Sequence, residues 1–231
     1  MPESLARGPL HSEDEAWTLL ASILAGERPA GADLTPTGLL ADEWAHLLMT
    51  LEGPQFHGTI TPPVMETLLT LQAAINRSLA LAAHGIENAR LLTDLEKSKV
   101  EIQVKVTEGT TTIDVDGTKI INHIADVVGS HMTGEQLMIV AIAIAVLFFG
   151  TSAYRTYLSK RAETRGRELE STDRAALVGQ IGGLSEQETE RARILAAAIA
   201  REPKVVVIKG EAERFYDSVL KSAADAGNAL S

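Results

Sequence analysis

The segment GEQLMIVAIAIAVLFFGTSAYRTYLSKR, residues 134–161, limits the possible folds of this chain more than any other feature. Between Glu135 and Arg155 it contains 19 consecutive residues without a formal charge. As a helix these residues extend about 28 Å, close to the thickness of the hydrocarbon core of a bilayer. Because this helix is apolar on all sides, it needs either lipid or a thick protein core around it.

The composition offers little material for such a core. The chain has 231 residues, of which 45% are hydrophobic but only 4% are aromatic. Domains of about 100 residues bury only part of their surface, so the apolar segment favours lipid or an oligomer. Cysteine is absent, which excludes a disulfide framework, a thiolate metal site and a cysteine nucleophile.

Charge is distributed unevenly along the chain. Residues 1–135 contain 19 acidic and 8 basic residues, whereas residues 136–231 contain 12 acidic and 13 basic residues. An acidic region of this kind binds nucleic acid and anionic lipid poorly. An anionic partner is therefore expected to contact the carboxyl-terminal part of the chain.

We predict an α+β fold built from consecutive segments, beginning with residues 1–35 as a tail and a helix capped by Ser12 and Glu15. Residues 36–131 are expected to form an acidic, antiparallel ββαββ domain. Pro62 and Gly85 mark the two ends of its long amphipathic helix, and a second helical piece follows. The strands are expected at 45–51, 55–61, 100–106 and 111–116.

The remaining segments are the apolar helix, at 132–158, and a charged carboxyl-terminal α/β domain, at 159–231. In that last domain a helix is expected to begin at Ser185 and to end before Pro203. The run KVVVIKG that follows is rich in β-branched residues and predicts a strand, then a turn and a helix.

The residues that flank the apolar helix favour a transmembrane span. The 20 residues before it contain Lys119 as their only basic residue, whereas a basic collar follows it. This asymmetry predicts an inner-membrane protein whose soluble domains are cytoplasmic, with a re-entrant hairpin through residues 118–134 as one possible topology. The alternative is a helix buried at the centre of a soluble oligomer. The collar residues are Arg155, Lys160 and Arg161.

Small residues within the apolar helix favour self-association, because they let helices approach closely in lipid. Several such helices can ring a pore that opens and closes by dewetting. The alternative is a simple anchor in which alanine fills space. The self-association residues are Ala141, Ala143, Ala145, Leu147, Gly150, Thr151 and Ser152.

Catalytic patterns are weak, so we predict neither an enzyme nor a cofactor. The six histidines are scattered, although the first hairpin is expected to bring His46 and His57 opposite each other as a cross-strand pair. Asp114 and Asp116 lie on one strand face, where a solvated strand end is favoured over a divalent ion. A basic group near the carboxyl terminus is either a contact surface for an anionic ligand or a solvated helix face. Its members are Arg191, Arg193, Arg201, Lys204 and Lys209.

The layout of an acidic α/β front, one late helix such as LMIVAIAIAVLFFG and a charged α/β tail resembles membrane effectors of bacterial anti-phage defence, particularly the channel-forming partner of Hailong-type systems. The resemblance implies a tetrameric channel that is kept silent by a DNA oligomer from a partner nucleotidyltransferase and that stops growth of the infected cell when it opens. From the apolar helix, its small residues and the basic collar we predict a regulated homo-oligomeric effector that forms an ion channel or otherwise permeabilises the inner membrane, and the resemblance places it in anti-phage defence. An anchored scaffold without pore activity is the alternative, and an enzyme with an unrecognised site comes third.

Overall fold

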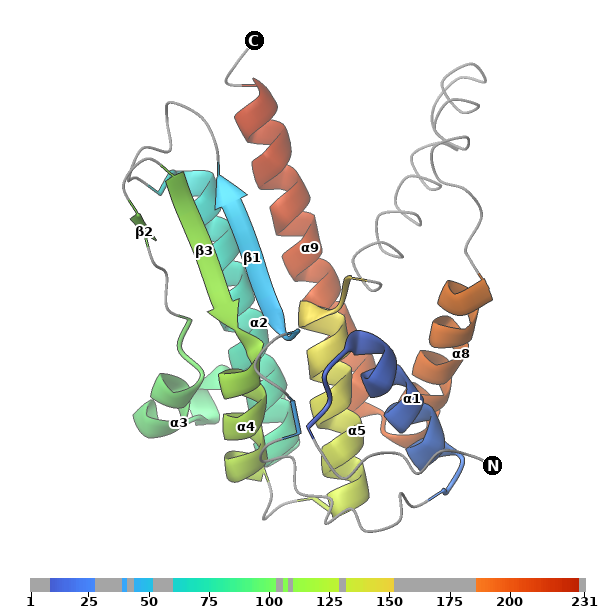
Figure 1. Cartoon of the computed structure of the whole chain (residues 1–231). Helices are drawn as coiled ribbons and strands as arrows, with labels where there is room; N and C mark the ends of the chain where they lie inside the picture. The colour runs from blue at the N-terminus through green and yellow to red at the C-terminus, as the bar shows by residue number, and fades with distance from the viewer. Residues whose placement is uncertain are drawn as a thin grey trace.

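One apolar helix lies at the centre of the chain in the computed structural model (Figure 1). It consists of α5 (Gly134–Ile144) and the π-helical turn η3 (Ala145–Phe149). Every side chain from Leu137 to Phe149 is buried. The structure describes residues 9–27, 39–40, 44–51, 60–102, 106–107, 110–128, 132–151 and 186–228.

The cover over α5 comes from elements of the same chain. Among the described residues it packs against α1 (Glu13–Leu24), α4 (Gly117–Val128) and α9 (Lys204–Asn228). Tyr216 of α9 donates a hydrogen bond to the backbone carbonyl oxygen of Leu147, in the π-helical turn. The apolar helix is therefore the core of this fold, because its neighbours remove its side chains from water.

Specific residues fix both ends of the central helix. Thr133 caps its start, and Gln136 completes the capping box. At the other end Gly150 has an extended backbone, with ψ of 137°. A side chain at Gly150 would collide with the carbonyl oxygen of Val146, and it would lie 2.9 Å from a carboxylate oxygen of Glu13. The helix therefore stops where only glycine fits.

The predicted transmembrane helix at 132–158 is wrong. Among the residues that the structure describes, no helix combines the length and the apolar character that a membrane crossing needs. Gly150 ends the apolar helix after the 11 residues of α5 and the five of η3. The prediction of an inner-membrane channel effector fails with that helix, and so does that of an anchored scaffold.

The predicted self-association residues lie in the core instead. Ala141, Ala143, Ala145 and Leu147 are buried against the rest of the chain. Thr151 follows the break, and both its backbone N–H and its hydroxyl donate to Glu13, at 2.9 Å and 3.0 Å. Ser152 and the collar residues Arg155, Lys160 and Arg161 lie outside the described residues.

The longest helices, α2 (Pro62–His84) and α9, pack side by side in antiparallel directions (Figure 1). Thr67 of α2 hydrogen-bonds to Ser222 of α9. Arg77, which lies ten positions after Thr67 on α2, donates to Glu211 of α9. Buried residues recur at spacings of three and four along both helices, which is the pattern of a close-packed helix pair. On α9 this buried stripe contains Val205, Ile208, Ala212 and Phe215.

The predicted strand at the start of α9 is wrong, because this segment packs as part of a helix. Lys204 is already helical, and Val205 and Ile208 lie on the buried stripe that faces α2 and α5. Packing of that stripe outweighs the weak preference of β-branched residues for strands. With α8 (Glu186–Arg201), the described part of the carboxyl-terminal region is helical, so the predicted α/β domain is wrong.

The sheet is smaller than predicted, and the ββαββ domain is wrong. Its strands are β1 (His46–Leu51), β2 (Val106–Thr107) and β3 (Thr110–Asp116), in the antiparallel order β1-β3-β2. The predicted strand at 45–51 is confirmed, and most of the one at 55–61 lies outside the described residues. The segment 100–102 is not a strand, because it turns away after α3 to hydrogen-bond with α2.

Two short elements connect α2 to the sheet. The 3-10 turn η2 (Ala89–Leu91) is capped by Asn88, and α3 (Asp94–Lys99) follows it. Neither element contains a buried residue. The buried Leu92 precedes α3 and the buried Val100 follows it, so the chain is fixed on both sides of an exposed helix.

Candidate functional site

A polar cavity lies between α2 and α3. Its volume is about 310 Å³, near the lower limit of cavities that hold small ligands. All of its lining side chains carry hydrogen-bonding or charged groups. They are Gln72 and Asn76 from α2, Asp94, Lys97 and Ser98 from α3, and Glu101 just beyond it.

Gln72 fixes the distance between the two sides of the cavity. Its amide nitrogen donates to the carbonyl oxygen of Val100 at 3.1 Å, and its amide oxygen accepts from the backbone N–H of Ile102 at 2.7 Å. The same nitrogen also donates to Asn76, one turn further along α2, at 3.2 Å. The side chain of Gln72 thus bonds to a backbone C=O and a backbone N–H beyond α3, as the backbone of a neighbouring strand would.

The other side of the cavity is α3, which begins with a complete capping box. The Thr93 hydroxyl accepts from the backbone N–H of Glu96, and the Glu96 carboxylate accepts from the backbone N–H of Thr93 at 2.6 Å. This backbone hydrogen bond, followed by the one from the Thr93 hydroxyl, holds the pKa of Glu96 below its usual value. The ionised Glu96 therefore stabilises the start of α3.

The charges around the cavity are unequal. Asp94 and Glu101 supply carboxylates, and Lys97 supplies an ammonium group 3.9 Å from Asp94. Asp94 is exposed to solvent, so its attraction to Lys97 is weak and can be exchanged for contact with a ligand. The lining therefore has two carboxylates and one ammonium group, so its net charge is negative and attracts cations. It is suited to holding a molecule by ion pairs and hydrogen bonds.

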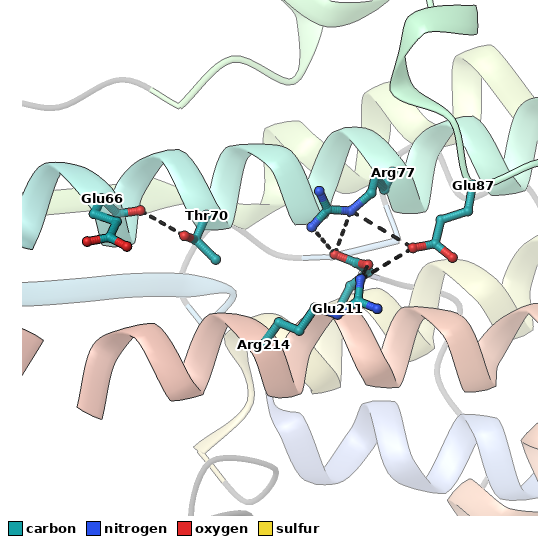
Figure 2. Close-up of polar contacts among 6 residues, drawn as sticks. All are labelled: Glu66, Thr70, Arg77, Glu87, Glu211 and Arg214. Atoms are coloured by element: carbon teal, nitrogen blue, oxygen red, sulfur yellow. Dashed lines mark hydrogen bonds and ion pairs between the residues drawn. The ribbon is translucent and has the colours of Figure 1, made fainter. Parts of the chain in front are cut away.

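A second polar group, the ion cluster, lies where α2 and α9 meet near the start of the loop to α3 (Figure 2). It consists of Arg77, Glu87, Glu211 and Arg214. The Nε of Arg77 donates to Glu211 at 2.8 Å, and Arg214 also pairs with Glu211. Only 1% of the Glu211 side chain is exposed, so its charge depends on these two partners.

Glu87 extends the ion cluster from the helices to the loop. Its carboxylate lies 4.0 Å from Nε of Arg77 and 3.5 Å from Nη1 of Arg214. A hydrogen bond shared with Glu211, together with burial and repulsion from the same carboxylate, raises the pKa of Glu87. Attraction to Arg214 offsets part of this rise. The fold therefore favours the protonated form of Glu87 more than the unfolded chain does.

The basic residues predicted to contact an anionic ligand already have partners within the chain. Arg191 pairs with Asp14 of α1, and Arg201 donates to Glu135 of α5 at 2.9 Å. Arg193 pairs with Glu190, and Lys209 with Glu213. Lys204 begins α9, and its backbone N–H donates to Glu202 at 3.3 Å. An anion at the paired residues would have to displace carboxylates, which argues for the alternative of a solvated, ion-paired surface.

The partners predicted for the chain stay predictions. They are a regulatory DNA oligomer or nucleotide, a second copy of the chain and a partner nucleotidyltransferase, and no contact tests them. The prediction that the chain is not an enzyme is also untested.

The remaining candidate residues form a small group at the end of the sheet. Asp116 pairs with Lys119 at 2.9 Å, and Nε2 of His46 lies 4.0 Å away from its carboxylate. Burial raises the pKa of Asp116, but hydrogen bonds from Lys119 outweigh it and leave a lowered pKa. Within the described ranges no three His, Asp or Glu side chains group as metal ligands, and His57 lies outside those ranges.

Sequence patterns did not reveal the cavity or the ion cluster. Gln72 stands among apolar residues in its helix, and Arg77, Glu87 and Glu211 are separated by up to 134 positions. The usable signal was local: two amides, Gln72 and Asn76, recur at a spacing of four on one helix.

No family model matches the chain, and comparisons with curated proteins and with solved structures find no relative.

Proposed function

We propose that this protein binds a small, positively charged polar molecule in the cavity between α2 and α3. The observation that supports this function is the cavity itself, with a volume of about 310 Å³, amides on its α2 side and charged groups on and just beyond α3. A ligand with ammonium groups can replace Lys97 beside Asp94 and reach Glu101. The hydrogen-bonding amides on α2 orient its polar atoms.

The charge of the whole chain supports the same ligand class. The formal net charge is −10 at pH 7, so the surrounding field attracts cations and repels anions. Gln72 adds rigidity, because two of its hydrogen bonds fix α2 relative to the chain beyond α3. A site that is already formed loses less entropy when it binds a ligand.

The test is binding of defined amines to the full chain. Putrescine, spermidine and lysine are the probes, and glutamate and inorganic phosphate are the contrasting anions. We expect the amines to shift backbone amide signals of α2 and α3 in a ¹H–¹⁵N spectrum. Binding also raises the thermal midpoint, since a ligand at about 100 times its Kd adds about 2.7 kcal/mol to the stability.

Matched variants assign the binding to the cavity. The double variant Asp94→Asn, Glu101→Gln removes both cavity carboxylates and is expected to abolish amine binding. The control double variant Glu27→Gln, Glu186→Gln makes the same change of charge at two exposed positions elsewhere. It should bind as the wild-type chain does. Lys97→Met removes the competing cation and should tighten putrescine binding.

Three results contradict the proposal. The first is that none of the probes shifts signals of α2 or α3. The second is that glutamate or phosphate binds as tightly as the amines. The third is that the cavity and control variants lose amine binding equally.

A further inference from the structure

The wall of the cavity formed by α3 is held by contacts outside α3 itself. No residue of α3 or of the preceding turn η2 is buried. Helices of this length are marginal in water without tertiary packing. The position of α3 against α2 therefore depends on the points where the chain around it is attached.

Three attachments hold the stretch from Gly85 to Ile102. The buried side chains of Leu92 and Val100 provide the first, on either side of α3. The second is the set of hydrogen bonds from Gln72. The third is Glu87, which ties the beginning of the stretch to the ion cluster between α2 and α9 (Figure 2).

Glu87 is the attachment whose charge can change. The charged groups that face it are Arg77 of α2 and Glu211 and Arg214 of α9. When Glu87 is ionised it competes with the buried Glu211 for the same two guanidinium groups. When Glu87 carries a proton, it shares that proton with Glu211 and leaves the guanidinium groups to the buried carboxylate.

We infer that Glu87 is a positioning residue that couples the protonation of the ion cluster to the α3 wall of the cavity. Protonated Glu87 hydrogen-bonds to Glu211 and leaves both guanidinium groups to that buried carboxylate, so it holds the loop against the ion cluster and reduces the motion of α3. Ionised Glu87 keeps its ion pairs with Arg77 and Arg214, but repulsion from Glu211 weakens this attachment. The effect on ligand affinity rests on the proposed function, whereas the effect on α3 itself does not.

The direction of the pH effect follows from linkage. The pKa of Glu87 is raised in the fold, so its stabilising contribution is complete below the ordinary glutamate pKa and is lost as pH rises through the raised value. Glu96 acts in the opposite direction, because its pKa is lowered and its capping contribution is lost as pH falls. Protection of α3 should therefore reach a maximum between these two titrations.

The experiment is amide hydrogen exchange of Leu95 to Lys99 over a range of pH, corrected for intrinsic exchange rates. In the wild-type chain we expect protection to rise several-fold as pH is lowered through the titration of Glu87. Glu87→Gln, which imitates the protonated side chain, should give high protection throughout that range. The control is Glu66→Gln, which changes an exposed carboxylate of α2 that pairs with Lys221 and should keep the wild-type profile.

A measurement on the wild-type chain gives an independent check. The side-chain carboxyl carbon of Glu87 can be titrated by NMR, and its midpoint should coincide with the rise in α3 protection. Different midpoints, or equal pH profiles for the wild-type chain and Glu87→Gln, would overturn the coupling.

Ligand binding separates this inference from the proposed function. If putrescine binds, its affinity should follow α3 protection in the Glu87 range, and Glu87→Gln should remove that pH dependence. If putrescine and the other amines do not bind while α3 protection still depends on Glu87, the coupling stands and the proposed function fails. If putrescine binds but α3 protection does not depend on Glu87, the proposed function stands and the coupling fails.

Discussion

The helices α5 and α3 show two different ways of holding a helix in one chain. The side chains of α5 from Leu137 onward are buried, and other helices cover them. The residues of α3 are all at least partly exposed, and a capping box and attachments at its flanks hold it. Apolar burial fixes α5 through many small contacts, whereas a few polar contacts fix α3.

This difference separates the stable part of the molecule from the part proposed to bind a ligand. Local opening costs little free energy where few apolar contacts must be broken. Loss of one polar attachment should therefore change the motion of α3 without unfolding the core. A substitution in α5 should instead reduce the stability of the whole fold.

The largest expected effect comes from Ile142→Ala in α5. Ile142 is fully buried, and truncation of a buried isoleucine costs about 2–5 kcal/mol. The matched change Leu95→Ala in α3 removes a side chain that is 68% exposed and should cost less than about 0.5 kcal/mol. Urea denaturation of both variants measures the difference. Equal losses would contradict the contrast between the two helices.

Glu211→Gln tests the ion cluster, with an expected loss of about 2–3 kcal/mol. Loss of one member of a buried ion pair typically costs about 3–5 kcal/mol, and the cost is lower here because the arginine partners keep contact with water. The control is Glu213→Gln on the same helix, where the half-exposed pair with Lys209 contributes less than about 1 kcal/mol. Equal losses of unfolding free energy in the two variants would show that the ion cluster does not stabilise the charge of Glu211.

Two glycines give effects of opposite sign. Gly150→Ala introduces a methyl group against the carbonyl oxygen of Val146 and should cost about 1–3 kcal/mol. Gly210→Ala in α9 meets no atom within 4 Å and should add about 0.5–1 kcal/mol, because alanine favours a helix. Thermal unfolding of both variants decides this, and a neutral Gly150→Ala would remove the reason for the break after α5.

The smallest effect is expected from Glu96→Gln in the capping box of α3, about 0.5 kcal/mol or less at pH 7. The pKa of Glu96 is lowered in the fold, so its contribution is present above the ordinary glutamate pKa and is lost as pH falls through the lowered value. Amide exchange in α3 should therefore be faster in the variant at pH 7 and equal to wild type in acid. A difference that persists in acid would exclude the charge as its cause.

Local signals predicted the ends of several elements correctly. Ser12 caps α1, as its position before three acidic residues indicates, and its hydroxyl accepts from the backbone of Glu15 at 3.2 Å. Gly85 ends α2 with a positive φ of 71°, a conformation that glycine adopts easily. These features depend on neighbours within one turn, so the sequence contains the needed information.

Features that depend on distant neighbours could not be predicted in this way. The apolar run around Ala143 is compatible with lipid and with protein, and only the packing of other helices distinguishes the two. Glu211 looks like an ordinary surface acid until the pairing of α9 with α2 places it beside Arg77. The cavity likewise requires the register between α2 and the residues after α3, which no local pattern gives.

The antiparallel pairing of α2 with α9 has a consequence for biosynthesis. Arg77 and its partner Glu211 are 134 positions apart, so α2 leaves the ribosome roughly ten seconds before the helix that covers it. During this interval the buried stripe of α2 is open to chaperones and to other nascent chains. The core of this protein therefore closes only once α9 has been made.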